Sequence, residues 1–197
     1  SPTVEREEVP LSSRTTSSEM DTINTRNLIS QYKREIEGND EQKAHQAVHS
    51  LINMGEEGIR ELTRLIKFAS GSNSERIWNV LKERNDEQTI KILVGSLTDF
   101  SLKDNAREVL KPKDPILTTK ELAPLLTKRH MHDDINSLVL YFGPVVISEL
   151  ENHIFNDYSQ VREGIAKLLV QFDTPEAYQV LEQMKNDTSF SVKRIVK

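Results

Sequence analysis

Two histidines stand four residues apart in a segment with helical spacing. His45 and His49 would project from the same face of that helix, an arrangement that can offer two imidazole nitrogens to one metal ion. However, no glutamate follows His45, and no third ligand lies nearby in the sequence. We therefore interpret both histidines as ordinary polar positions.

A second group of metal-ligating residue types is denser and contains His130, His132, Asp133 and Asp134. These side chains could bind a divalent ion. The two aspartates also occupy the first turn of a predicted helix, where the helix dipole favours carboxylates without any metal. We assign no metal to the sequence, and ion binding at His130, His132 and Asp133 is left open.

The residue types of other reaction centres are missing. The sequence has no cysteine, which excludes disulfides, thiolate nucleophiles and Cys-based zinc sites. Gly71 begins no phosphate-binding loop, because the second glycine and the lysine of that motif are lacking, and no Gly-x-Ser-x-Gly motif occurs. Acidic pairs such as Glu56/Glu57 and Glu149/Glu151 are typical of charged helix surfaces. We predict a non-enzyme without catalytic residues or cofactors.

Helices must position these side chains, because an apolar triplet with i, i+3, i+4 spacing recurs five times. Successive triplets follow each other at steps of 29, 29, 29 and 30 residues. A short segment containing helix-stopping residues follows each triplet, and a second apolar stripe follows that segment in most units. The triplets are Val48/Leu51/Ile52, Ile77/Val80/Leu81, Ala106/Val109/Leu110, Ile135/Leu138/Val139 and Ile165/Leu168/Leu169.

Each unit therefore predicts a helix, a tight turn and a second helix. Such a pair cannot bury its apolar faces alone, so neighbouring pairs must stack around one shared core. We predict an all-α fold, specifically a right-handed α-solenoid (alpha-alpha superhelix) of about five two-helix repeats. Trp78 is expected to pack between repeats. Strands are not expected, because period-two alternation and Asn-Gly or Asp-Gly turns are missing.

The predicted domain organisation has two parts. Residues 1–22 are rich in Ser and Thr and predict a disordered tail or linker. The solenoid is predicted over residues 23–197, beginning with a leading helix and ending in a truncated repeat that opens at Val192. Three prolines, Pro112, Pro115 and Pro124, predict a kink near residues 112 to 128.

The fifth unit resembles the HEAT-like repeat family, of the short bacterial type also found in phycobilisome lyase subunits. The residues that carry the resemblance are Val161-Arg162-Glu163-Gly164-Ile165-Ala166-Lys167-Leu168-Leu169 and Asp173-Thr174-Pro175-Glu176-Ala177. They are similar to the family's valine-arginine first helix and its aspartate-proline-glutamate-alanine turn. The resemblance covers roughly residues 40 to 197 and implies an armadillo-like scaffold with a binding surface. The family's arginine position is occupied by His45, Ser74, Lys103, His132 and Arg162.

The distribution of charge along the sequence indicates which kinds of partner the protein can bind. The net charge is −5, and between residues 130 and 190 ten acidic residues stand against three basic ones. Such a field repels phosphate backbones and favours a basic partner. No segment is long and apolar enough to insert into a membrane. We expect part of a longer protein, either cytoplasmic or a soluble domain of a membrane-anchored one.

We therefore predict a non-catalytic protein-protein interaction scaffold or adaptor that binds its protein or peptide partner on a concave surface of second helices. The alternatives are a nucleic-acid-binding helical-repeat protein, which the acidic stretch argues against, and an accessory subunit of a lyase-type enzyme, which rests on the family alone. The uncovered last repeat also predicts end-to-end self-association. The candidate partner-binding residues are Arg60, Arg64, Lys67 and Lys91 in the early units, and Glu149, Asn152, Gln179 and Glu182 in the late units.

Overall fold

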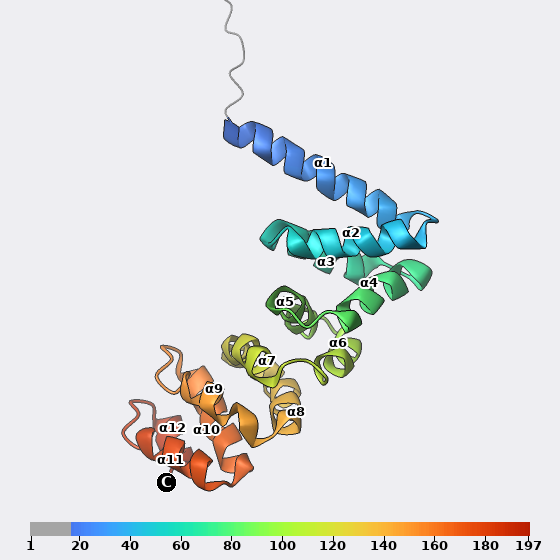
Figure 1. Ribbon diagram of the computed structural model, residues 1–197. Helices are drawn as coiled ribbons and strands as arrows, with labels where there is room; N and C mark the ends of the chain where they lie inside the picture. The colour runs from blue at the N-terminus through green and yellow to red at the C-terminus, as the bar shows by residue number, and fades with distance from the viewer. Residues whose placement is uncertain (1–16) are drawn as a thin grey trace, which may run out of the picture.

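The computed structural model describes residues 17–197, with side chains from residue 19 onward. Every regular element in this part of the chain is helical, which confirms the all-α prediction for it. Figure 1 shows the helices succeeding each other from α1 at one end to the C-terminal helices at the other. The α-helices are α1 (Ser17–Glu37), α2 (Glu41–Asn53), α3 (Glu56–Phe68), α4 (Gly71–Glu83), α5 (Glu87–Ser96), α6 (Lys103–Leu110), α7 (Pro115–Leu122), α8 (His132–Phe142), α9 (Ile147–Glu151), α10 (Ser159–Phe172), α11 (Pro175–Gln183) and α12 (Phe190–Ile195), and the 3-10 helices are η1 (Ala123–Thr127), η2 (Arg129–Met131) and η3 (Pro144–Val146).

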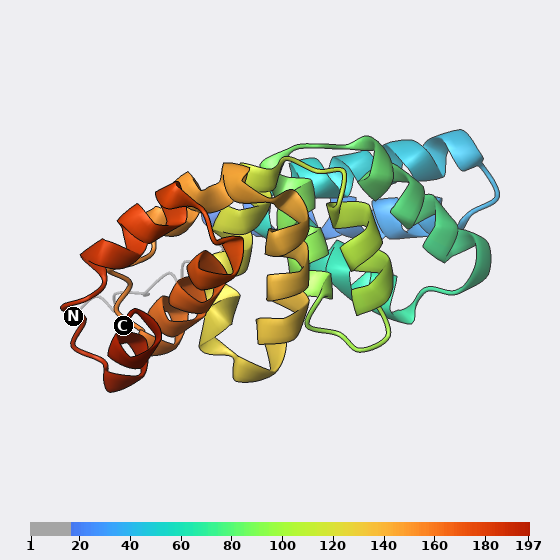
Figure 2. The same ribbon diagram turned by 90° about the horizontal axis from the view of Figure 1, so that it is seen from below.

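Many alternate helices pack against each other, in two series. Helix α2 contacts α4, α8 contacts α10, and α10 contacts α12. In a second series, α3 contacts α5, α5 contacts α7, and α7 contacts α9. In Figure 1, α5, α7 and α9 lie on one side of the stack and α4, α6 and α8 on the other. Figure 2 shows the same succession from below, with the early helices at one end and the last helices at the other.

One apolar core joins these helices from Ile36 in α1 to Val196 at the end of α12. All the side chains of the five triplets belong to it, and none of them is more than 4% exposed. Trp78, at 5% exposed, also lies in this core, as expected for a packing role. The repeated triplets therefore mark the residues that adjoining helix pairs bury together.

Short polar segments end one helix and begin the next. Gly55 and Gly143 follow α2 and α8 and adopt positive φ values of 72° and 79°, which a glycine accepts without steric cost. Other helices begin on a side chain that accepts a hydrogen bond from a backbone amide of their first turn. Such N-caps are Asp40 for α2, Asp86 for α5, Asp114 for α7 and Thr174 for α11.

The first helix is longer than its apolar stripe predicts. Helix α1 begins at Ser17, whereas the sequence places the boundary between tail and helix at residue 23. Apolar side chains of its first turns are largely exposed, with Met20 at 55% and Ile23 at 50%. Apolar periodicity marks only helix that is packed, so it misses these turns. The remainder of the expected tail, residues 1–16, lies outside the described residues.

The proline-rich third unit departs from α geometry. Helix α7 ends at Leu122 and continues as the 3-10 helix η1, whose first residues include Pro124. Proline has no amide hydrogen to donate to the preceding turn, so an α-helix cannot continue regularly through it. The irregular segment falls within residues 112 to 128, where the prolines predict a kink.

A buried lysine joins the second and third helix pairs. Lys113 lies in the turn between α6 and α7 and is only 3% exposed. Its Nζ donates hydrogen bonds to the backbone oxygens of Lys82, at 2.8 Å, and of Arg84. These oxygens lie at the C-terminal end of α4, where a cation also complements the helix dipole. Burial lowers the pKa of Lys113.

We expect Lys113→Met to lower the free energy of unfolding by about 1 to 3 kcal/mol, because it leaves two backbone oxygens without a donor. Urea unfolding followed by circular dichroism measures this. Lys111→Met is the matched control, since Lys111 pairs with the exposed Glu108 and lies 5.5 Å from the ring centre of the exposed Tyr141, and its loss is expected to cost less than about 1 kcal/mol. Equal effects of the two substitutions would contradict the capping role.

Helices α2 and α3 approach each other closely at Gly58. A Cβ atom built on this glycine would lie 1.8 Å from the carbonyl oxygen of Leu51, a distance that the backbone cannot accommodate. At Gly95 in α5, by contrast, a Cβ atom would meet nothing within 4 Å.

We predict that Gly58→Ala destabilises the protein by about 1 to 3 kcal/mol or more through overpacking. Gly95→Ala is the control, and its higher helix propensity is expected to add up to about 1 kcal/mol. Thermal unfolding of both variants measures the difference. If Gly58→Ala were as stable as the original protein, the close helix approach would be wrong.

Candidate interaction surface

The residues selected from the sequence lie in two groups on the second series of helices. Arg60, Arg64 and Lys67 belong to α3, and Lys91 belongs to α5, which contacts α3. Arg60 and Lys91 line the same shallow groove. The late group is on α9 and α11, two helices that also contact each other, with Glu149 on α9, Asn152 directly after it, and Gln179 and Glu182 on α11.

The late group presents less free charge than its residue types suggest. The side chain of Glu149 is only 12% exposed, and its carboxylate accepts hydrogen bonds from Asn152 and from the imidazole of His153. Glu182 pairs with Lys185 at 2.5 Å. Gln179 is exposed. The late residues therefore offer hydrogen-bonding groups more than a strong negative field.

On α3, two cations of the early group, Arg64 and Lys67, lie further out than the carboxylates that pair with them. The Glu61 side chain is 17% exposed, and its carboxylate lies 2.8 Å from Arg64 Nη2 and 3.4 Å from Lys33 Nζ of α1. Arg64, by contrast, is 57% exposed. Lys67 shows the same arrangement. Its side chain is 54% exposed, and its Nζ lies 3.0 Å from Oδ2 of Asp99, whose side chain is 20% exposed. Positive charge therefore faces solvent along this side of α3.

The two less exposed carboxylates, those of Glu61 and Asp99, are held in their charged form. The hydrogen bonds from Arg64 lower the pKa of Glu61. Hydrogen bonds from the Ser101 hydroxyl, Lys67 and the Ser101 amide hold the pKa of Asp99 at about 2. Both carboxylates stay ionised at neutral pH and fix the outward cations in place.

An exposed aromatic ring and an apolar hollow adjoin this basic surface. Phe68, the last residue of α3, is 76% exposed. It lines a cavity of about 340 Å³ together with the apolar side chains of Ile36, Leu65 and Ile77, and with Lys33 and Arg64. Phe100 follows α5 and is 88% exposed, with Lys103 5.6 Å from its ring centre.

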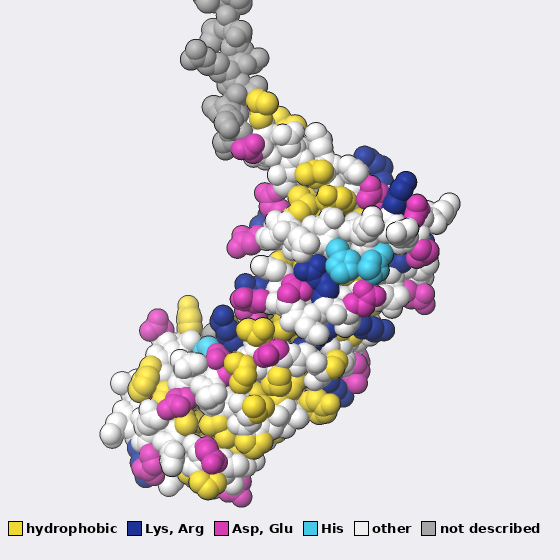
Figure 3. Space-filling view, viewed as in Figure 1, with side chains coloured by type: hydrophobic (Ala, Val, Ile, Leu, Met, Phe, Trp, Pro, Cys, Tyr) yellow, Lys and Arg dark blue, Asp and Glu magenta, His cyan; other side chains and the backbone are white. Residues whose placement is uncertain are grey.

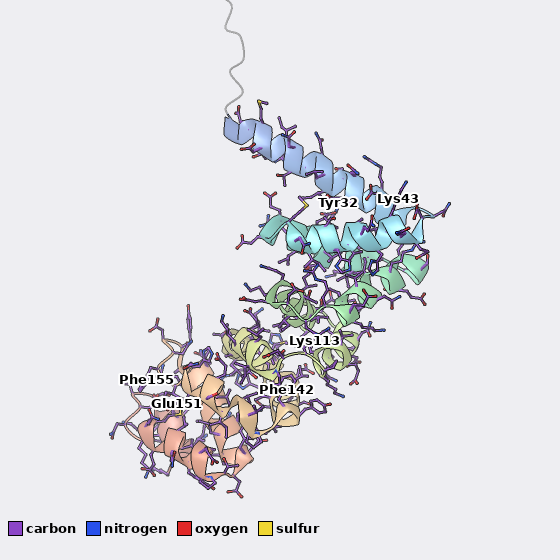
Figure 4. The ribbon with its side chains drawn as sticks, in the orientation of Figure 1. Tyr32, Lys43, Lys113, Phe142, Glu151 and Phe155 are labelled. Carbon is purple, nitrogen blue, oxygen red and sulfur yellow. The ribbon has the colours of Figure 1, made fainter. Side chains whose placement is uncertain are left out.

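Exposed aromatic residues also follow the second helices of late units. Phe155, labelled in Figure 4 in the loop after α9, is 77% exposed and lines a hollow with Arg162 and Met184. Phe190, which begins α12, is 75% exposed. The sequence analysis did not select any of these phenylalanines, because they lie outside the repeated triplets. Their recurrence after second helices is the signal that could have found them.

In the denser of the two histidine-containing groups, at residues 130–134, several side chains have other partners. His132 Nε2 lies 2.7 Å from the backbone oxygen of Leu126, and Asp134 pairs with Arg107 and, at 3.8 Å, with Lys103. His130 and Asp133 are exposed. Within residues 19–197, this group does not converge on a common point where an ion could bind.

The other group, His45 and His49, lies beside a third metal-ligating side chain that sequence spacing does not reveal. Glu83, at the end of α4, lies beside His45 and His49 of α2, and ligand atoms of all three lie within 4.8 Å of one another. Partial burial lowers the pKa of His49, as do the neighbouring positive charges of His45 and Arg84. Glu83 is 34 or more residues away in the chain, so no local motif contains it.

No protein-family model matches the sequence, and a comparison with curated proteins also gives no match. In the part of the chain that the structure describes, no helix is long and apolar enough to cross a membrane.

The low pKa of Asp99 predicts how stability depends on pH. A carboxylate whose folded-state pKa is lowered contributes stability above its ordinary pKa of about 4, and that contribution is lost as the pH falls toward about 2. Asp99→Asn is therefore expected to be less stable than the original protein at pH 6, with the difference shrinking between about pH 4 and pH 2. Urea unfolding at each pH measures this. The exposed Asp133→Asn controls for general loss of negative charge, and a pH-independent difference at Asp99 would contradict the assignment.

Proposed function

We propose that this chain is a HEAT-like α-solenoid of about five helix pairs that acts as a non-catalytic protein-interaction scaffold. Its partner would be a protein segment that is acidic and carries apolar side chains, bound where α1, α3 and α5 adjoin. The repeated triplets and the contacts between alternate helices support the solenoid arrangement. In this arrangement, α3, α5, α7 and α9 are the second helices that line the concave side.

One observation carries the proposed binding mode. On α3, cations are more exposed than the carboxylates that neutralise them, and the exposed Phe68 stands beside the last of these cations. Arginine and aromatic side chains are enriched at the energetically important centres of protein interfaces. An acidic segment would meet the outward faces of Arg60, Arg64 and Lys67, while an apolar side chain of the same segment fills the hollow beside Phe68.

The remaining second helices extend this surface toward the C-terminal end. Asn152, Gln179 and Glu182 are exposed on or beside α9 and α11 and could hydrogen-bond to a polar or basic continuation of the partner. The favoured orientation therefore places the acidic part of the partner at the early units.

A displayed library of random peptides tests the proposal directly. We expect selected peptides to carry net negative charge and at least one aromatic or branched aliphatic residue, and to bind more weakly as salt increases. The double charge reversal Arg60→Glu/Arg64→Glu is expected to weaken their binding about tenfold, or about 1.4 kcal/mol. Phe68→Ala, at an exposed position that cannot disturb folding, should weaken it as well.

The matched control is Lys128→Glu/Arg129→Glu, which changes the net charge equally at two exposed residues, Lys128 before η2 and Arg129 at its start. Peptides that bind the control as tightly as the original protein, and bind the α3 variants weakly, would support the proposed surface. If selected peptides bind all variants alike, the α3 surface is wrong. The apolar surface of the late units, which includes the exposed Tyr141, Val145 and Val170, would then be the next to test.

A further inference from the structure

Helices α2 and α4 bring three metal-ligating side chains together at the surface of the first two helix pairs. His45 and His49 project from successive turns of α2, and Glu83 is the last residue of α4. Figure 3 shows histidine side chains side by side on this face, next to an acidic side chain. The ring centres of the two histidines are 4.7 Å apart.

Two of the three ligand separations nearly fit a tetrahedral metal ion, and the third, between the two imidazoles, is at most 4.8 Å. His45 Nε2 lies 2.8 Å from Glu83 Oε2, and His49 Nε2 lies 3.9 Å from the same oxygen. Ligand atoms around a tetrahedral Zn²⁺ with bonds of about 2.0 to 2.2 Å are roughly 3.3 to 3.5 Å apart. Both separations therefore need to change by only about half an ångström. The three side chains are 46%, 32% and 53% exposed, which leaves them room to rotate.

We propose that His45, His49 and Glu83 bind one divalent transition-metal ion, with Zn²⁺ as the reference ion. Two imidazole nitrogens and one carboxylate oxygen form a set that suits Zn²⁺ and its neighbours in the first transition row, and they disfavour Mg²⁺ or Ca²⁺. A water molecule completes the tetrahedral coordination of the ion at the fourth position, which faces solvent. Gln46 follows His45 and supplies no carboxylate, so the site has no general base of the kind that zinc hydrolases place there.

The ion connects the first helix pair to the second. In its absence, this face of α2 is joined to the end of α4 by the His45–Glu83 contact. Arg76 also pairs with Glu41 in the first turn of α2, and Arg84 contacts Asn53 at its last residue. A metal ion that binds only the folded arrangement stabilises it by mass action, so stability rises with ion concentration.

Arg84 competes with the ion for His49. Its Nη1 lies 3.1 Å from His49 Nδ1, and because a guanidinium can only donate, this contact places the proton of a neutral His49 on Nε2. Coordination through Nε2 requires that proton to move to Nδ1. Arg84 retains Asp86 and Asn53 as partners, at 2.7 and 2.8 Å, when it releases the ring.

Calorimetric titration of the tag-free, chelator-treated full chain with ZnCl₂ tests the site. We expect one ion per chain and a melting temperature that rises with Zn²⁺. His45→Ala and Glu83→Gln should each lower the affinity at least about tenfold and abolish the thermal shift. Both residues are exposed, so both variants are expected to fold, which far-UV circular dichroism checks. Replacing Zn²⁺ with Co²⁺ should give the visible absorption of a tetrahedral site, which Glu83→Gln should alter.

The chain contains its own control pair. His153 and Glu149 also contact each other at 2.9 Å, but they lack a second histidine, so His153→Ala should leave Zn²⁺ affinity unchanged. Arg84→Gln removes the competing charge and offers an oxygen that accepts from Nδ1–H, so it should raise the affinity severalfold. Absence of binding, binding that survives in His45→Ala, or binding that is lost in His153→Ala would overturn the proposal. Unchanged or lower affinity in Arg84→Gln would overturn coordination through His49 Nε2.

Discussion

The fold depends on apolar side chains that one helix pair cannot bury alone. Leu51 of α2 and Leu168 of α10 are fully buried, although each helix has one face open to solvent. The adjoining elements supply the missing cover, as the contacts of α2 with α1, α3 and α4 illustrate. A core assembled in this way grows along the chain rather than outward. That explains how a sequence with only 36% hydrophobic residues forms one continuous core.

Polar side chains then fix how adjoining segments meet. Arg76 of α4, only 11% exposed, donates to the backbone oxygens of Ile36, in the last turn of α1, and of Gly38, directly after it. Arg162 of α10 has the same exposure, donates to the backbone oxygen of Asn156 and pairs with Asp187 at 2.7 Å. Such cations satisfy backbone groups that helix ends leave without partners. Among the positions three residues before each triplet, only that of the fifth unit holds an arginine, so the sequence pattern does not indicate the role of Arg76.

The apolar pattern predicted the helices that are packed and their shared core, since burial imposes the period that a sequence shows. It did not predict the start of α1, where Met20 is 55% exposed. Nor did it identify the exposed phenylalanines or the neutralising roles of Glu61 and Asp99, because exposed and paired side chains obey no such period. The candidate surface on α3 was found by its charged residues, while the carboxylates that orient them became clear only from the fold.

The convergence of Glu83 with the histidines shows why cross-helix sites resist sequence analysis. Contacts between α2 and α4 join residues separated by 38, 35 and 31 positions, as in His45–Glu83, Arg84–His49 and Arg84–Asn53. Arg107 of α6 instead reaches Asp134 over 27 positions, and Arg162 reaches Asp187 over 25. The apolar repeat holds a step near 29 throughout, whereas the offset between facing polar residues varies with the crossing of each helix pair. A period can therefore locate a core, but the geometry of each crossing decides which polar residues meet.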